Sequence, residues 1–257
     1  MVTEAIAATA RPKAILNQRS PPCLSPIATE ITALFDLKTT SRLVRSGQEI
    51  VREGRRCAAV FLLTEGIAIR YRILRDGQRQ ILSFVLPGDF VGVTSCRFDS
   101  ALYSVKTLTD ATIATMPLAR LVALAETHPR VAAKLFWSFG CEAAILAEHL
   151  IAVGRRSATE RIAHLLLELF SRLQRIGLAD ERSYRLPLTQ EIISDALGLS
   201  IPYVNRVLQQ LRQQGLVTIK DQCVVIENFE ELAALADFEH AYLHPLSIAE
   251  LLPQIDD

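Results

Sequence analysis

The stretch LTQEIISDALGLSIPYVNRVLQQLRQQGLVTI, residues 188–219, limits the folds open to this chain more than any other part of it. Its apolar residues have helical spacing, yet Gly198 interrupts them, and glycine takes the left-handed conformation that ends a helix at little cost. Thr189 and Ser200 are favourable N-caps for the helices on either side. Pro202 falls in the first turn of the second helix, where its missing N–H costs nothing. The stretch therefore predicts two short helices joined by a tight turn.

The predicted second helix has two unlike faces. Val204, Leu208 and Leu211 form an apolar stripe that we expect to be buried. Gly215 then ends the helix, and LVTIKDQCVVI predicts a β-hairpin that turns near residues 220–222. Two short helices at a tight turn followed by such a hairpin are typical of a winged helix-turn-helix. The free face of the helix carries polar, aromatic and basic side chains, namely Tyr203, Asn205, Arg206, Gln209 and Gln213.

These side chains have the chemistry of a DNA reader. The second helix of such a motif enters the major groove with its N-terminal end first, where arginine pairs with guanine and Asn or Gln with adenine. Ile201 and Pro202 offer no side-chain hydrogen bonds, so we expect base discrimination to fall largely on Arg206. The full set of predicted base contacts is Tyr203, Asn205, Arg206 and Gln209. The predicted phosphate contacts, which set register without reading sequence, are Thr189, Ser200 and the wing residue Lys220.

The segment from about Gly47 to Pro117 has a different pattern, of short apolar runs separated by glycines. Alternating apolar residues over 67–73 precede Asp76-Gly77, which is a favourable two-residue hairpin turn. The run 104–117 predicts two further strands. We therefore expect a small antiparallel β-barrel or β-roll here.

A long helix is predicted after Pro129. Apolar residues 132, 136, 139, 143, 146, 150 and 153 are spaced alternately by four and three, which is a heptad seam. A helix over 130–153 is roughly 36 Å long. It can lie on its own barrel or pair with a second copy, and the unbroken seam favours an intertwined homodimer. The predicted interface residues are Phe136, Phe139, Ala143, Leu146, Leu150 and Val153.

Gly154-Arg155-Arg156 is predicted to break the helix, and Ser157 to Glu160 resembles a capping box that opens the next one.

These elements predict five segments in chain order. They are a flexible arm at 1–26, a β-roll effector domain at 27–128, a dimerisation helix and hinge at 129–155, a winged helix-turn-helix at 156–227 and an acidic tail at 228–257. The net charge is zero, because 28 basic side chains balance 28 acidic ones. Residues 227–257 contain eight acidic and no basic side chains, however, so the rest of the chain is mildly basic.

This order of elements resembles the Crp/Fnr family of bacterial transcription regulators. LTQEIISDALGLSIPYVNRVLQQLRQQGLV resembles the family's DNA-binding segment, and GRRSATERIAHLLLELF the helix before it. VREG, FLLTEGIAIRYRILRDGQRQILSFVLPGDFVG and LTDATIA resemble its effector module. The resemblance implies an α+β protein with a cyclic-nucleotide-binding-like β-roll, a long dimerisation helix and a C-terminal winged helix-turn-helix. It also implies a homodimeric, sequence-specific DNA-binding regulator of an inverted repeat, with RNA polymerase as a further candidate partner.

The sequence departs from the family's ligand-binding members. Cyclic-AMP-binding members carry an Arg-Ser pair that grips the cyclic phosphate, but the corresponding stretch here, SALYSVKTL, has no arginine. Iron–sulfur members need several N-terminal cysteines, and only Cys23 lies there. The five histidines all lie outside residues 47–117, so haem ligation by the roll has no support. We expect no cofactor and no metal, and we assign no ligand-binding residues.

Two alternatives belong to other classes. A cupin-type enzyme shares a small β-barrel, but it needs a cluster of His and Glu ligands on the strands, which the sequence lacks. A ligand-binding sensor can use its C-terminal helices for protein contacts, and Arg206 beside Asn205 on the free helix face argues against it.

The five scattered cysteines, without Cys-x-x-Cys, favour reduced thiols in the cytoplasm. No uninterrupted apolar run approaches the roughly 18 residues of a membrane span, so we expect no membrane contact.

Overall fold

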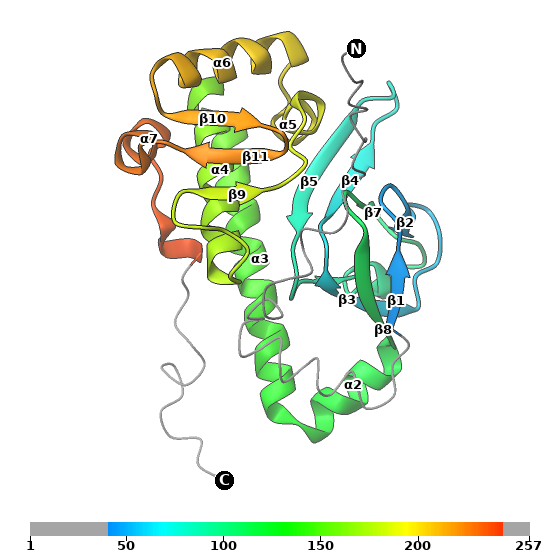
Figure 1. Ribbon diagram of the computed structural model, residues 1–257. Helices are drawn as coiled ribbons and strands as arrows, with labels where there is room; N and C mark the ends of the chain where they lie inside the picture. Colours follow the sequence, from blue (N-terminus) through cyan, green and yellow to red (C-terminus); the bar gives the residue numbers. More distant parts are fainter. Residues whose placement is uncertain (1–40, 244–257) are drawn as a thin grey trace, which may run out of the picture.

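The N-terminal half of the protein is an antiparallel β-roll, shown in blue to green in Figure 1. The structure is a computed structural model that describes residues 41–243. The predicted arm at 1–26 and the last part of the predicted tail, 244–257, lie outside these residues. Two four-stranded sheets form the roll, in the orders β1-β8-β3-β6 and β2-β7-β4-β5. The strands are β1 (Ser41–Val44), β2 (Glu49–Val51), β3 (Ala59–Glu65), β4 (Ala68–Ile73), β5 (Arg79–Val85), β6 (Phe90–Val91), β7 (Ser104–Thr107) and β8 (Ala111–Pro117).

The predicted hairpin at Asp76-Gly77 joins β4 to β5. Gly77 takes a φ of 86°, which favours glycine, and the Asp76 carboxylate accepts a bond from the Gln78 N–H at 3.0 Å. A register shift between Arg70 and Tyr71 interrupts the alternation along β4. Both of these side chains are buried, at 7% and 6% exposure. The shift thus allows β4 to place a charged side chain inside the protein.

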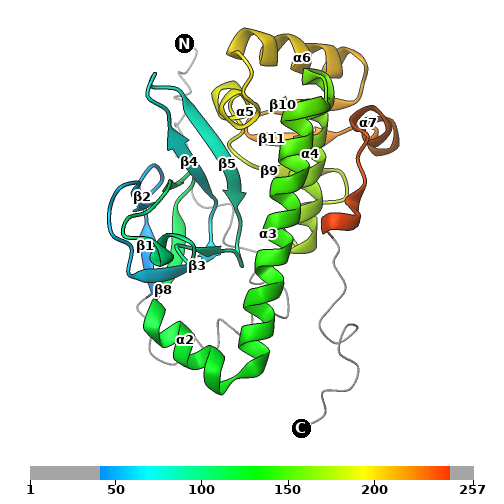
Figure 2. The ribbon, with the colours of Figure 1, turned by 180° about the vertical axis from the view of Figure 1, so that it is seen from behind.

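Two helices lead out of the roll, namely α2 (Leu118–Thr127) and α3 (Pro129–Arg155). His128 separates them, because its backbone is not helical (φ −130°, ψ 85°), and Pro129 is favourable as the first residue of α3. Figure 2 shows α3 running along the side of the roll from α2 to the C-terminal domain. The long helix predicted from the heptad seam is confirmed.

The predicted break at Gly154-Arg155-Arg156 is confirmed, although α3 ends at Arg155 and not at the glycine itself. The helix continues through Gly154, and the first extended residue is Arg156. A glycine inside a helix costs only about 1 kcal/mol relative to alanine, which the neighbouring turns offset. Arg156 is held in place instead by its own contacts, because it donates to Glu148 at 3.0 Å and its carbonyl accepts from Arg161 at 2.8 Å.

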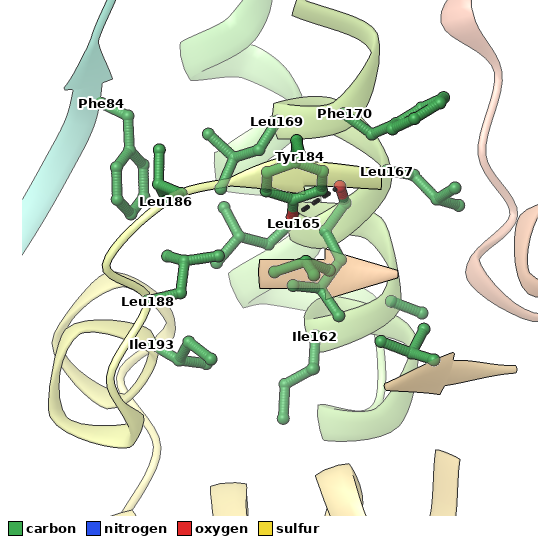
Figure 3. Close-up of a cluster of buried hydrophobic side chains, with 14 of the residues drawn as sticks. Phe84, Ile162, Leu165, Leu167, Leu169, Phe170, Tyr184, Leu186, Leu188 and Ile193 are labelled. Carbon is green, nitrogen blue, oxygen red and sulfur yellow. Dashed lines mark hydrogen bonds between the residues drawn. The ribbon is translucent and has the colours of Figure 1, made fainter. Parts of the chain in front are cut away.

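The C-terminal half is a winged helix-turn-helix. It comprises α4 (Ala158–Arg175), β9 (Ser183–Arg185), α5 (Gln190–Leu197), α6 (Ile201–Gln213), β10 (Val217–Lys220) and β11 (Cys223–Ile226). The predicted capping box at the start of α4 is present, between Ser157 and Glu160. Strand β9, which is absent from the elements expected from the sequence, completes a sheet in the order β10-β11-β9. In Figure 3 its Tyr184 lies among the leucines of α4 and donates a hydrogen bond to the Leu166 carbonyl at 3.1 Å.

Residues 228–243, assigned above to an acidic tail, instead fold against the C-terminal domain. They form α7 (Phe229–Ala236) and the short 3-10 helix η3 (His240–Leu243), and Asn228 caps α7. Leu232 and Phe238 are buried in the same core as α4. Their side chains bury apolar surface, which stabilises the domain. The many acidic residues of this segment make these few apolar residues difficult to recognise in the sequence.

The two halves share one buried core. Ile69, Ile81 and Phe84 of the β4–β5 hairpin belong to the same cluster as buried residues of α4 and α5. Polar contacts accompany this packing, since Arg79 donates to Asp195 of α5 at 2.6 Å and Gln80 donates to the Ala196 carbonyl at 3.1 Å. The first helix of the helix-turn-helix is therefore fastened to the roll.

Candidate nucleic-acid interface

The turn between α5 and α6 follows the sequence prediction closely. The Thr189 hydroxyl accepts from the Ile192 N–H at 3.2 Å, and Gly198 takes the left-handed conformation with φ 63°. The Leu199 N–H donates to the Ser194 carbonyl, and the Ser194 hydroxyl donates back to the Leu199 carbonyl. These paired bonds close the turn and set the angle at which α6 leaves it.

Helix α6 lies at the end of the molecule opposite α2, and both ribbon views show it on the outside (Figures 1 and 2). Its buried side chains are Val204, Val207 and Leu211. The apolar stripe predicted from the sequence contains Leu208 in place of Val207, but Leu208 is only partly buried. Val207 and Leu208 both lie on the apolar side of α6, and the rotation of the helix about its axis determines that Val207 is the more deeply buried.

The free face of α6 carries the predicted base-reading residues. Tyr203, Arg206 and Gln209 are exposed, and Asn205 is half-buried. The Arg206 guanidinium lies 5.6 Å from the centre of the Tyr203 ring, within the range of a cation–π contact. Ile201 is also exposed, at 46%, so it presents apolar surface at the leading end of the helix.

The predicted phosphate contacts lie around this helix. Within the described chain the Ser200 oxygen accepts no capping bond from the first turn of α6, whereas the Thr189 oxygen already accepts a backbone bond. Lys220 is exposed beside the wing turn, where Asp221 and Gln222 take left-handed φ values of 51° and 61°. Arg185, which is not among the predicted contacts, is exposed on β9 and pairs in register with Cys223 of the wing. Tyr184 is buried between two more exposed residues, and this alternation of apolar and polar side chains is the pattern from which β9 could have been predicted.

One face of α3 is apolar and open. Phe136 is 81% exposed and Leu150 is 75% exposed in the protomer. All six predicted interface residues keep exposed surface, namely Phe136, Phe139, Ala143, Leu146, Leu150 and Val153. The opposite face carries the contacts within the protomer, such as Glu142 with Arg70. An uncovered stripe of this length is the pattern of a helix that pairs with another.

The absence of a long uninterrupted apolar run does not rule out an apolar helix of membrane-spanning length. Within residues 41–243, the part of α3 from Val131 to Arg155 is long and apolar enough for a span by length and composition alone. The opposite face of the helix carries Glu142, Glu148 and His149 in polar contacts within the same protomer.

A buried ionic network joins α3, α4 and the roll. The Glu168 side chain of α4 is fully buried and lies 2.8 Å from His149 of α3 and 3.3 Å from Arg172. Arg172 also donates to Asp89 of the roll at 3.1 Å and to the Phe84 carbonyl at 2.9 Å. Burial alone lowers the pKa of His149, but the charge and hydrogen bond of Glu168 outweigh it and raise that pKa. Burial alone raises the pKa of Glu168, and His149 and Arg172 together bring it below its usual value.

A cavity of about 110 Å³ lies beside this network, between the roll, α3, α4 and η3. Arg70 borders it, forms an ion pair with Glu142 and lies 4.8 Å above the centre of the Tyr103 ring. Burial lowers the pKa of Arg70. The side chains of the Arg70–Glu142 ion pair occupy part of the space between the roll and α3. Among the described residues, no group of three or more His, Cys, Asp or Glu side chains is placed to hold a metal ion.

The fold and the site together define a class of protein. A helix with a polar free face is presented by a tight turn beside a β-wing, and it is attached to a β-roll and a long helix with an open apolar face. This is the architecture of a DNA-binding transcription regulator with an effector-type N-terminal domain.

Comparison with known proteins identifies the family. Residues 41–128 match the model of the cyclic nucleotide-binding domain, and residues 160–235 match the Crp-like helix-turn-helix domain. The transcriptional activatory protein AadR of Rhodopseudomonas palustris is 32% identical over 181 residues, 68% of this chain and 74% of AadR. The nitrogen fixation regulation protein FixK of Bradyrhizobium diazoefficiens is 31% identical over 175 residues, 68% of this chain and 72% of FixK. The solved structure of FixK2 from Bradyrhizobium japonicum superposes with a TM-score of 0.69 at 31% identity, covering 77% of this chain and 97% of FixK2.

The chain belongs to the Crp/Fnr family, and it is a DNA-binding transcription regulator of that type. The resemblance stated from the sequence is confirmed. The family consists of transcription regulators, not of enzymes.

Proposed function

We propose that this protein is a cytoplasmic homodimer that binds an inverted-repeat DNA site through α6. One observation carries the proposal: the polar free face of α6 is exposed at the outer end of a domain that is fastened to the roll and to α3. A regulator that reads an inverted repeat needs two such helices related by a two-fold axis. The open apolar stripe of α3 supplies the surface for that symmetry.

The proposed division of contacts follows from the position of each side chain. Arg206 lies about one turn beyond Pro202 on the exposed side, so it follows the N-terminal end of α6 into the groove. Asn205, Tyr203 and Gln209 assist it, and Ile201 can contact a thymine methyl group. Thr189, Ser200 and Lys220 contact phosphates, and we add Arg185 to this group because β9 places it beside the wing.

The test compares substitutions of Arg206 and Lys220 on a duplex obtained by in vitro selection from a random pool. Arg206→Ala should cost about 1–3 kcal/mol on the selected site and relax preference at one base pair. Lys220→Ala should weaken selected and scrambled duplexes alike and reduce the log–log salt slope by about one unit. Fluorescence anisotropy titrations at several salt concentrations measure both effects.

Arg120→Ala is the matched control, because Arg120 is exposed on α2 at the opposite end of the molecule. It should bind like the wild type. If Arg206→Ala kept the wild-type preference, the assignment of α6 as the reading helix would be wrong. A chain that bound no duplex specifically would favour the alternative, in which the C-terminal helices of a ligand sensor mediate protein contacts.

RNA polymerase is a further proposed partner, because the similar AadR is named a transcriptional activatory protein.

We also propose that the roll binds neither cyclic AMP nor cyclic GMP. The remaining cavity between the roll and α3 is about 110 Å³, against roughly 300–1,000 Å³ for sites that hold small molecules. The side chain of Arg70 is already committed to Glu142 and Tyr103. The stretch 100–108 offers no arginine to a cyclic phosphate.

Calorimetric titration of the full chain with cyclic AMP or cyclic GMP should therefore give no saturable heat. The same preparation should give saturable heat with the selected duplex, which shows that the protein is active. Saturable binding of either nucleotide at micromolar concentration would contradict the proposal. The effector would then have to displace the Arg70–Glu142 pair.

A further inference from the structure

Two cysteines that are far apart in the sequence meet at one edge of the roll. Cys57 lies in the loop between β2 and β3, and Cys96 lies in the 3-10 helix η2 (Ser95–Arg97) that follows β6. Their sulfur atoms are 3.8 Å apart. Both thiols also donate toward the carbonyl of Ala59, at 3.3 Å from Cys57 and 3.4 Å from Cys96. The two thiols therefore share one acceptor and face each other.

The chain path at Gly92 makes this approach possible. Gly92 takes a φ of 92°, and a Cβ built there would lie 2.8 Å from the Ala59 carbonyl oxygen and 3.4 Å from the Cys57 sulfur. Any larger residue would push β6 away from the loop that carries Cys57. The Cys96 N–H then donates to the Gly92 carbonyl at 2.8 Å, which brings η2 back over that loop.

Both cysteines are only partly buried, so small oxidants can reach them. We propose that Cys57 and Cys96 form a reversible intramolecular disulfide when the protein meets a peroxide. The sulfur atoms must approach from 3.8 Å to about 2 Å, a movement that the loop at 52–58 and η2 can share. This modification site is independent of the proposed DNA-binding function.

The reaction balances with hydrogen peroxide as the oxidant. The Cys57 thiolate attacks one peroxide oxygen, which gives a sulfenic acid at Cys57 and releases water after one proton transfer. The Cys96 sulfur then attacks the Cys57 sulfur, the sulfur–sulfur bond forms, and the hydroxyl leaves as a second water with the Cys96 proton. Burial and the neighbouring Cys57 raise the pKa of Cys96 to about 12, which leaves little Cys96 thiolate to attack peroxide, so we assign the first attack to Cys57 and the second, resolving step to Cys96.

The bond would connect a part of the roll that contacts α2 and α3 to the loop that carries Cys57. Cys96 packs against the apolar cluster that includes Leu121 and Leu124 of α2 and Leu135 of α3. A disulfide to Cys57 ties this cluster to the loop between β2 and β3 and closes a loop of intervening chain. The oxidation state is thereby linked to the place where the roll joins α2 and α3.

The test treats the reduced full chain with a small excess of hydrogen peroxide and maps its cysteines. Of the five thiols, two should be lost, and the intact mass should fall by about two hydrogens for each chain. Trypsin digestion without reductant should join peptide 57–70 to peptide 80–97, and dithiothreitol should separate them. Cys57→Ser and Cys96→Ser should each prevent the link, whereas Cys223→Ser, a change in the wing, should retain it.

A second variant guards against misfolding of the single substitutions. With Cys23, Cys141 and Cys223 all replaced by alanine, the thiol count should fall from two to zero on oxidation, and denaturing electrophoresis without reductant should show only the mass of one chain. Five unchanged thiols in the wild type, a link to another cysteine, or sulfinic acid at Cys57 without a link would each overturn the proposal.

Discussion

Replacing Leu150 with glutamate should leave a folded protomer that no longer pairs with a second copy. Leu150 is 75% exposed in the protomer, so its fold does not depend on this side chain. In a homodimer through α3, the new carboxylate of each copy would instead be buried at the seam, and an unpaired buried charge costs about 3–5 kcal/mol. Self-association should weaken by at least about 100-fold. We choose Leu150 over Leu146 because Leu146 is 41% exposed and also lines the cavity.

Multi-angle light scattering measures this result directly. The wild type should show twice the chain mass at micromolar concentration, and Leu150→Glu should show the mass of one chain. Val122→Glu is the matched control, since Val122 is 48% exposed on α2, outside the seam. Circular dichroism should show unchanged helix content in both variants. A monomeric wild type, or a Leu150→Glu variant that stays dimeric, would contradict the proposed interface.

The second large effect concerns the buried carboxylate of α4. Glu168→Gln should lower the free energy of unfolding by about 3–5 kcal/mol, the range for removing one partner of a buried ion pair. Glu168 has no exposed side-chain surface and faces both His149 and Arg172. The neutral amide leaves these two donors buried without their common counter-charge. Urea unfolding followed by circular dichroism measures the change in free energy.

The Glu168–His149 ion pair determines the pH range in which Glu168→Gln lowers the free energy of unfolding most. The folded pKa of Glu168 is lowered, so its stabilisation is present above its unfolded value of 4.5 and is lost as the pH falls through the folded pKa. The folded pKa of His149 is raised, so its stabilisation is present below 6.5 and is lost as the pH rises through the folded pKa. The difference between wild type and variant should therefore be largest between pH 4.5 and 6.5.

Glu230→Gln is the control, because Glu230 is exposed on α7. It should change the free energy of unfolding by less than about 0.5 kcal/mol. If Glu168→Gln had an equally small effect at about pH 6, within the range where both groups are charged, the network would not hold α3 against α4. A difference that grew steadily as the pH fell below the unfolded pKa of Glu168 would show that another group is responsible.

The helix-turn-helix illustrates what a local sequence can predict. Thr189, Gly198 and Pro202 act through their own backbone and the next turn, so their effects do not depend on distant residues. The same holds for the capping box at Ser157 and for the hairpin turn at Asp76-Gly77. The long helix is predictable for the same reason, because apolar spacings of three and four residues reflect the turns of a single helix. Which bases and phosphates each side chain contacts stays a prediction.

The surroundings of the site could not be predicted in the same way. Arg70 is charged and alternates with apolar residues, so its sequence pattern indicates an exposed position, yet Glu142 of another element gives it a buried partner. Glu168 is likewise a charged residue on an amphipathic helix, and only the approach of His149 and Arg172 makes its burial favourable. The acidic composition around 228–243 also conceals the few apolar side chains that pack on α4.

The sequence by itself thus determined the elements and their order: a β-roll, a long helix with one apolar stripe, and two short helices followed by a wing. Only the tertiary structure decided which charged groups are paired inside, how α5 is fastened to the β4–β5 hairpin, and that Cys57 meets Cys96. The physical reason is the range of the interactions. Caps, turns and amphipathic spacing involve residues within a few positions of one another. An ion pair or a thiol contact between distant residues depends on the whole chain path that brings them together.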